Sequence, residues 1–263
     1  MWKKDDYRRT MLKKIRLDKY LSDHTEWTRS QIKKKVASGL VKVQDAVIKD
    51  AGYKVSADDV IEMEGQQICG QQYQYLLFHK PAGIVSATED AREETVLDAV
   101  RRGGFAGEGE VPFLAKDLFP MGRLDKDTEG LLLITNDGDL AHRLLAPKKH
   151  VDKVYYADIR GVVTDEHVRQ FASGLTLSDG TAVMPGELVV LDVDSTAKTS
   201  RIRLTIHEGK FHQVKRMFEA VGTEVTYLKR LSMGPLSLDE NLLPGEYRRL
   251  TDEEINMLKE ATA

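Results

Sequence analysis

Cysteine is nearly absent from this sequence: Cys69 is the single one among 263 residues, so no disulfide can form within the chain. Such a sequence suits a reducing compartment. Long apolar runs are also missing, since no stretch approaches the ~20 residues that a membrane helix requires. The N-terminal segment MWKKDDYRRTMLKK is basic but has no apolar stretch of the kind found in secretory signals. We therefore expect a soluble, cytoplasmic protein.

Phosphate-binding loops and metal-binding spacings are missing too. The sequence has no GxGxxG between a strand and a helix and no GxxxxGK[ST], so we expect no nucleotide cofactor. A zinc site is not expected, because the single cysteine has no partner at metal-ligand spacing. The chain does contain 41% hydrophobic and 31% charged residues, values close to those of folded globular proteins. Its length allows one large domain or two domains.

Positive charge is concentrated near the N-terminus. Residues 1–54 hold 15 Lys and Arg against 7 Asp and Glu, a formal charge of +8, whereas the remainder carries −11. A basic segment on an acidic body predicts a polyanionic partner that the basic segment engages. Charge alone leaves a second interpretation open, in which the basic residues form a solvated surface.

The same N-terminal segment has a regular pattern. Apolar residues in 15–21 recur at helical spacing, and a second helix is predicted after Thr28 or Ser30, either of which can cap it. Gly39 can end that helix, and the short strand-like runs LVKVQ, AVIK and DVIEME follow. Two helices that display Lys and Arg beside a small hairpin are typical of a module that binds the RNA backbone.

This stretch resembles an S4 domain, the small RNA-binding module of ribosomal protein S4 and of several RNA-modifying enzymes. We assign the domain to residues 15–63, preceded by a basic extension, residues 1–14. The resemblance implies that five cations face structured RNA: Arg16, Lys19, Arg29, Lys33 and Lys34.

A glutamine-rich segment, residues 64–72, is predicted to link this domain to a second one, residues 73–263. The second domain alternates strand patterns such as KVYYADIRG and RIRLTIHEG with helical patterns such as TDEHVRQFASGL. Strands separated by both helices and hairpins predict an α/β or α+β domain with a mixed or antiparallel sheet, and we take the fold class as α+β. The glycine-rich segment 101–113 is predicted to be a surface loop.

Five acidic side chains surround an aliphatic run in FPMGRLDKDTEGLLLITNDGDL, residues 119–140. A calcium loop that starts at Asp125 is disfavoured, because its twelfth position is Asn136, where a bidentate glutamate is needed. Asp137 belongs to an Asn-Asp-Gly turn, and Asp139 can cap the helix that follows. Asp125 differs, because it follows an arginine in a loop that leads into a buried strand. An ionised carboxylate sheltered there suits a nucleophile.

The stretch GRLDKDTEGLLLITNDG closely resembles the catalytic motif of the pseudouridine synthases. Three further features resemble the branch of that family that modifies ribosomal RNA: HKPAG, the tail LPGEYRRLTDEE and the S4-like segment. The resemblance covers nearly the whole chain from Ile15 onward. It implies a catalytic domain with a long antiparallel or mixed sheet and a cleft across one face. It also implies an isomerase that requires neither a cofactor nor a metal.

Three charged residues take roles from this resemblance. Asp125 is the catalytic aspartate, Lys215 is the basic residue that pairs with it, and Arg123 helps to evict the target uridine and occupies its place in the RNA. Isomerisation breaks the N1–C1′ bond, rotates the free uracil and rejoins it through C5. The carboxylate can attack C1′, generate a glycal or add to C6. Each route needs Asp125 ionised, and a nearby lysine keeps the pKa of a buried aspartate low.

The remaining site residues come from the strands. The family's Lys-x-Tyr spacing favours Tyr155 over Tyr156 as the catalytic tyrosine. The resemblance implies that this residue stacks on the flipped base and can assist removal of the proton from C5. Leu204 and Ile206 would form part of the apolar wall against that base. His212 is assigned no catalytic role, because a backbone carbonyl can serve as its partner.

The stretch EGKFHQVKRMFEAVG is closer to the enzymes that modify small-subunit ribosomal RNA, which we expect as the substrate, either naked or in an assembly intermediate. A uridine in large-subunit ribosomal RNA is the close alternative. A non-catalytic assembly factor from the same scaffold is disfavoured, because it would not need Asp125, Tyr155 and Lys215 together. A glycosidase would need a second carboxylate, and the RNA-binding segment speaks against it. We expect a monomer.

Overall fold

The computed structural model of the chain describes residues 14–56, 59–68, 73–107, 114–146 and 149–262. It divides into two compact units. The N-terminal unit takes in the chain up to Tyr73 together with residues 112–117, and the second unit takes in residues 74–111 and 118–263. No helix in the described ranges is both long enough and apolar enough to cross a bilayer.

The N-terminal unit packs two helices, α2 (Leu17–His24) and α3 (Arg29–Ala37), against short antiparallel strands. Strands pair in the order β3-β2-β5-β6, and β1 pairs with β4. Their bounds are β1 (Ile15–Arg16), β2 (Val41–Val43), β3 (Ala46–Val47), β4 (Lys54–Val55), β5 (Ile61–Met63) and β6 (Gln66–Ile68).

Helix α3 begins where the sequence predicts. The Thr28 hydroxyl accepts the backbone N–H of Gln31 at 3.3 Å, and the Gln31 side chain accepts the N–H of Thr28 at 2.8 Å, which completes a capping box. Gly39, at a φ of 75°, follows the helix. Ile32 and Val36 are fully buried in the core of the unit, so the opposite face of the helix is left for its basic side chains.

The segment 64–72 differs from the predicted linker at its start. Strand β6 lies within it and pairs antiparallel with β5, so the folded unit continues past the expected boundary at Met63. Glu64 and Gly65 make the turn between the two strands, both in the left-handed region, at φ 54° and 85°. An edge strand with exposed glutamines has the polar composition of a linker, which explains the prediction. Residues 69–72 lie outside the described ranges.

The second unit is built on one large sheet in the order β13-β14-β10-β15-β9-β7-β17, with β8 beside β9 and β16 beside β15. β15 and β9 are parallel and the other pairs are antiparallel, so the α+β fold with a mixed sheet is confirmed. The strands are β7 (Tyr75–Lys80), β8 (Phe119–Pro120), β9 (Glu129–Thr135), β10 (Lys153–Arg160), β13 (Glu187–Asp194), β14 (Thr199–Ile206), β15 (Glu224–Met233), β16 (Leu236–Ser237) and β17 (Tyr247–Arg249).

The two halves of this sheet meet where β15 runs beside β9. The strands pair at Lys229↔Glu129 and Arg230↔Gly130. A Cβ atom at Gly130 would lie 2.2 Å from the carbonyl oxygen of Arg230, so the close approach requires glycine, which has a φ of 106° here. The junction therefore lies within the acidic motif, residues 119–140, that the sequence singled out.

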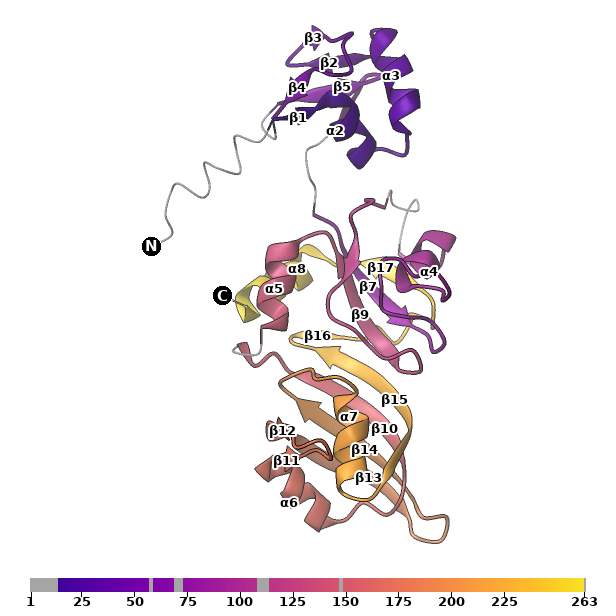
Figure 1. Ribbon diagram of the computed structural model, residues 1–263, viewed down its shortest axis with the longest axis vertical. Helices are drawn as coiled ribbons and strands as arrows, with labels where there is room; N and C mark the ends of the chain where they lie inside the picture. Colours follow the sequence, from indigo (N-terminus) through magenta and orange to yellow (C-terminus); the bar gives the residue numbers. More distant parts are fainter. Residues whose placement is uncertain (1–13, 57–58, 69–72, 108–113, 147–148, 263) are drawn as a thin grey trace, which may run out of the picture. The chain divides into compact units, whose positions relative to one another are not determined.

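Helices α6 (Asp165–Ser173) and α7 (Gln213–Ala220) lie over the half of the sheet formed by β13, β14, β10 and β15 (Figure 1). Phe171 and Phe218 meet between them, with ring centroids 4.9 Å apart. Along β14, Ile202 and Leu204 are fully buried and the alternating Arg201 and Arg203 are exposed, so the helices cover one face of this half. A separate hairpin, β11 (Leu175–Thr176) and β12 (Ala182–Val183), lies near α7.

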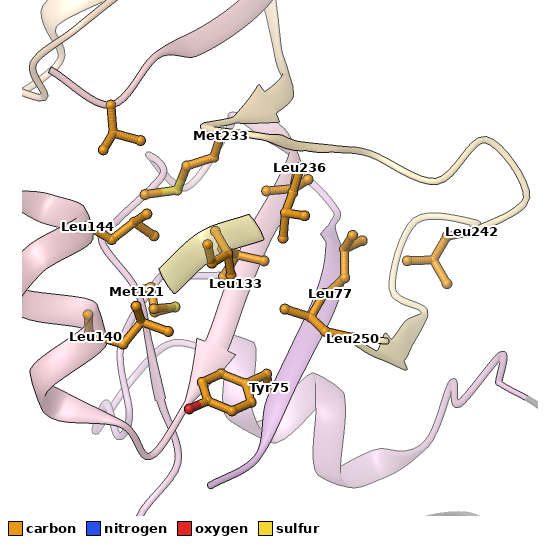
Figure 2. Close-up of a cluster of buried hydrophobic side chains, with 14 residues drawn as sticks. Tyr75, Leu77, Met121, Leu133, Leu140, Leu144, Met233, Leu236, Leu242 and Leu250 are labelled. Atoms are coloured by element: carbon orange, nitrogen blue, oxygen red, sulfur yellow. The ribbon is translucent and has the colours of Figure 1, made fainter. Parts of the chain in front are cut away.

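The other half of the sheet holds a large apolar core between its strands and the helices α5 (Gly138–Leu145) and α8 (Asp252–Ala261). Figure 2 shows Leu77 and Leu133 of the strands facing Leu140 and Leu144 of α5. Burial of each side chain of this size contributes about 1.5–3 kcal/mol to the free energy of folding. β9 therefore forms a rigid base for the loop that leads into it. Helix α4 (Val96–Arg102) ends inside the predicted loop 101–113, of which residues 108–113 lie outside the described ranges.

Candidate active site

Residues 121–128, here named the Asp125 loop, connect β8 to β9 and are held by backbone contacts. The N–H of Thr128 donates to the carbonyl of Asp125 at 3.1 Å. Ser86 binds Leu124 twice: its hydroxyl donates to the carbonyl at 2.8 Å and accepts the N–H at 3.0 Å. Leu124 itself is buried, so the residue before Asp125 anchors the loop and the Asp125 side chain remains partly exposed.

A buried lysine supports the same loop from β7. Lys80 has no exposed surface, and its ammonium donates to the carbonyls of Pro81 at 3.0 Å, Lys126 at 3.2 Å and Thr128 at 2.9 Å. Burial lowers the pKa of Lys80 to about 8, against the opposing effect of Asp127 and other acids. Lys80 belongs to the motif HKPAG, from which no role was predicted for this lysine.

A cation from α7 reaches Asp125. Nζ of Lys215 lies 3.3 Å from Oδ2 of Asp125 and 2.6 Å from Oδ1 of Asp127. Burial alone would lower the pKa of Lys215, but the hydrogen bond to Asp127 and the charges of both aspartates outweigh it and raise the pKa. Likewise, burial would raise the pKa of Asp127, and its bond to Lys215 lowers it. Lys215 therefore stays charged beside Asp125.

The other acids of the motif have partners of their own. Glu129 accepts a hydrogen bond of 2.7 Å from the hydroxyl of Tyr227. Asp137, and not the predicted Asp139, caps α5: it accepts the N–H three residues further on at 3.0 Å. Among the described residues, no group of three or more His, Cys, Asp and Glu side chains is arranged to hold a metal ion.

His212 also faces Asp125, with its Nε2 3.6 Å from Oδ1 of the carboxylate. The partner considered from the sequence was a backbone carbonyl, whereas the structure provides a carboxylate. The backbone of His212 has a φ of 49°, in the left-handed region that non-glycine residues seldom adopt. Such conformations gather at functional sites, where surrounding contacts hold them.

Asp125 and His212 line an open pocket. It has a polar side that includes Asp125 and an apolar side formed by the strands and α7. Its lining consists of Arg123, Leu124, Asp125, Thr128, Tyr155, Ile206, Gly209, Lys210, His212, Gln213, Val214 and Leu228.

The pocket contains four of the predicted site residues: Asp125, Arg123, Tyr155 and Ile206. Lys215 contacts Asp125 from outside the lining. Leu204 is not at the pocket, which corrects the expectation of a wall residue there. Its side chain is fully buried, and it would touch a Cβ atom at Gly186 instead.

The apolar side of the pocket differs from the predicted wall. Val214 and Leu228 line it beside Ile206. Neither residue was predicted for the wall, because strand and helix patterns do not show which buried residue borders a cavity. Their presence means that α7 and β15 contribute to the wall as well as β14.

The two adjacent tyrosines of β10 face opposite sides of the sheet. Tyr155 is 8% exposed and lines the pocket. Tyr156 points to the other face, where its hydroxyl donates to Asp158 at 2.7 Å. Lys153 is buried and donates to the carbonyl of Val151 at 2.6 Å, so it supports the start of the strand. A carboxylate, a cation and a buried tyrosine thus meet at one pocket.

Comparison with known sequences decides the family. The profile of the RNA pseudouridylate synthase family matches residues 74–220, and the S4 domain profile matches residues 15–61. The chain belongs to the RNA pseudouridylate synthase family. The resemblance expected from GRLDKDTEGLLLITNDG and the N-terminal pattern is therefore confirmed.

The relatives of this pseudouridine synthase match it over most of its length. An uncharacterised RNA pseudouridine synthase of Bacillus subtilis, YtzG, is 43% identical over 95% of this chain and 100% of its own. The ribosomal small subunit pseudouridine synthase A of Vibrio cholerae is 38% identical (92% and 98%), and the ribosomal large subunit pseudouridine synthase B of Bacillus subtilis is 36% identical (93% and 95%). A crystal structure of a pseudouridylate synthase, 35% identical, covers 93% of this chain and 99% of its own with a TM-score of 0.62.

In the S4 domain of this pseudouridine synthase, all five cations that the sequence assigned to RNA are exposed: Arg16, Lys19, Arg29, Lys33 and Lys34. Arg16 and Arg29 share one acid, since each lies 3.0 Å from Oδ1 of Asp18, whose side chain is fully buried. The hydrogen bond from Arg16 lowers the pKa of Asp18 to about 2. These two arginines therefore carry a structural ion pair in addition to any contact with RNA.

Proposed function

We propose that this pseudouridine synthase converts one uridine of small-subunit ribosomal RNA to pseudouridine, with Asp125 as the catalytic carboxylate. The observation that carries the proposal is the position of Asp125, beside Lys215 and in the same pocket as Tyr155. The Vibrio cholerae relative named for the small subunit supports the choice of substrate. The Bacillus subtilis relative named for the large subunit makes large-subunit RNA the second candidate.

Asp125 acts as an anion in this proposal. Lys215 at 3.3 Å stabilises the carboxylate, and the raised pKa of Lys215 keeps the ammonium charged at neutral pH. The carboxylate assists breakage of the N1–C1′ bond, the free uracil rotates, and a new bond joins C5 to C1′. One hydrogen leaves C5 and N1 gains one, so the atoms balance without a cofactor.

The pocket receives the uracil after the nucleotide has left the helix. Extrusion of a base costs a few kcal/mol. Stacking on an aromatic side chain, worth roughly 1–3 kcal/mol, offsets part of that cost, and Tyr155 supplies the ring. Ile206, Val214 and Leu228 supply an apolar surface beside it. Arg123 is exposed at the pocket, where it can take the place of the extruded uridine in the RNA.

The S4 domain supplies affinity for the RNA backbone. Its exposed cations, Arg16, Lys19, Arg29, Lys33 and Lys34, contact phosphates, whose neutralisation releases counterions. We place the enzyme in the cytoplasm as a monomer that acts on ribosomal RNA, either naked or in an assembly intermediate.

Tritium release from RNA made with C5-tritiated uridine tests the proposal, because C5 loses its hydrogen only when it is joined to C1′. Small- and large-subunit transcripts are assayed separately with the wild type, Asp125→Asn and the control Asp127→Asn. We expect tritium release from the small-subunit transcript. Asp125→Asn should abolish this release and Asp127→Asn should retain it. Release from the large-subunit transcript alone would identify that RNA as the substrate. Binding without release, on transcripts and on partly assembled particles, would indicate an assembly factor.

A further inference from the structure

We infer that Phe211, stacked on His212, is a platform for an unpaired base of the RNA next to the uridine that enters the pocket. The inference rests on the proposed function, since it concerns the same RNA at the same pocket. It adds a second base-binding position outside the pocket, formed by a residue that neither the sequence nor the family assignment singled out.

Phe211 is unusual for its exposure. Its side chain is 71% exposed, more than any other large hydrophobic side chain in the described residues. A single exposed apolar residue is common on protein surfaces and by itself means little. Here, however, the ring is not free to adopt any orientation. It stacks on the imidazole of His212, with centroids 3.7 Å apart and planes inclined by 19°. One face of the phenyl ring is covered and the other is offered to solvent.

The stack is fixed to the pocket at its inner end. His212 lines the pocket and lies 3.6 Å from Asp125. Its left-handed backbone, at φ 49°, turns the chain between Phe211 and α7. Arg216 lies one helical turn further on, where its Nη1 donates to the carbonyl of Phe211 at 3.4 Å and its Nη2 pairs with Asp179 at 2.5 Å. The aromatic pair is therefore held in place before any RNA arrives.

The chemistry of the surroundings selects a nucleobase as the ligand. Lys210 and Arg216 flank Phe211 but are paired with Glu208 and Asp179, so the exposed ring face is the group left to bind RNA here. Extrusion of one uridine leaves its neighbours without a stacking partner on one side. A flat, exposed ring at the pocket can replace that partner, and because every base has a π-face it does so without regard to sequence.

The test uses the full-length enzyme and an RNA hairpin with 2-aminopurine on either side of an unpaired uridine. Stacking on Phe211 quenches the fluorescence of 2-aminopurine. We expect quenching with the wild type and Phe211→Trp, none with Phe211→Leu, and about tenfold weaker binding for Phe211→Leu. Leu243→Ala, at a residue that is 63% exposed and outside the pocket, serves as the control for loss of exposed apolar surface. Tritium release is measured on the same variants.

The two readouts separate this inference from the proposed function. Phe211-dependent quenching without tritium release by the wild type would support the platform and remove the proposed activity. If the wild type releases tritium but Phe211→Leu changes neither the quenching nor the affinity, the platform would be overturned. A defect of Phe211→Leu that occurs on ribonucleoprotein particles and not on naked RNA would overturn it too, in favour of contact with a protein.

Discussion

Lys215 lies closer to Asp127 than to Asp125: its ammonium is 2.6 Å from one carboxylate and 3.3 Å from the other. The side chain of Asp127 is 72% exposed and that of Asp125 is 26% exposed. Water and salt screen an exposed ion pair, so the shorter contact is worth little in free energy. The longer contact lies in the pocket, where a bound base would exclude water and strengthen it.

Removal of the lysine charge should therefore impair catalysis, and removal of Asp127 should not. Lys215→Met is expected to lower kcat by about 100-fold or more, because the carboxylate loses its electrostatic partner in the reacting complex. Lys215→Arg should retain most activity and Asp127→Asn should stay within about threefold of the wild type. Single-turnover tritium release measures all three. Equal losses in Asp127→Asn and Lys215→Met would contradict this assignment.

Replacement of Tyr155 should weaken the reaction through lost stacking. Tyr155→Leu is expected to lower kcat/KM by roughly 5- to 150-fold, which corresponds to ~1–3 kcal/mol of stacking on one base. Tyr156→Leu provides the matched control, because that side chain lies on the opposite face of the sheet. If the two variants are equally impaired, the loss reflects damage to β10 and not contact with the base.

Gly130→Ala should destabilise the second unit. The added Cβ atom would lie 2.2 Å from the carbonyl of Arg230, so the parallel pairing of β15 with β9 could not persist. A loss above about 2 kcal/mol is expected in urea unfolding, with activity lost in proportion. At Gly138, no atom lies within 4 Å of a Cβ atom, so Gly138→Ala should change the free energy of unfolding by less than about 0.5 kcal/mol. Similar effects at both glycines would refute the steric explanation.

Charge removal on α3 should alter the salt dependence of RNA binding. Each of Lys33→Gln and Lys34→Gln is expected to reduce the slope of log K against log salt by ~0.7–0.9, since each lysine neutralises one phosphate. kcat at saturating RNA should not change. Lys42, which pairs with Glu62 on the small sheet, supplies the control Lys42→Gln. If none of these substitutions changes the slope, the RNA must contact another surface of the domain.

Acid should unfold the N-terminal unit through Asp18. Its hydrogen bond with Arg16 lowers the pKa of Asp18 from 3.8 to about 2 on folding. A carboxyl whose pKa falls on folding adds stability above its unfolded pKa, and this stability is lost as pH falls from about 4 to 2. Trp27 packs against the core of this unit, so its fluorescence reports the transition. Asp18→Asn should be less stable at pH 7 and should lose less stability on acidification. An identical acid profile would exclude Asp18 as the cause.

Local features of the chain are those that sequence patterns predict directly. Asp125 lies in a long continuous motif, and the cap at Thr28 depends on four neighbouring residues, so both could be read without knowledge of distant contacts. Strand alternation also required Tyr155 and Tyr156 to face opposite sides of the sheet, and family spacing indicated which of them faces the pocket.

The parts that depend on register and packing could not be read in this way. Leu204 and Ile206 share one face of β14, but α7 and the end of the strand determine that Ile206 alone reaches the pocket. His212 meets Asp125 only after α7 has packed against the sheet, and the role of Lys80 depends on carbonyls contributed by another segment. Such contacts join residues 46–87 positions apart, beyond the range of any local pattern.

The junction of β15 with β9 also governs the order in which the site is completed. Asp125 lies near the middle of the chain, but Lys215, Leu228 and the strand that pairs with Gly130 are among its last 50 residues. During synthesis, the S4 domain emerges long before those residues leave the ribosome. Non-local pairing of this kind raises contact order and slows folding. The nascent enzyme thus has its RNA-binding module exposed well before the pocket beside Asp125 can close.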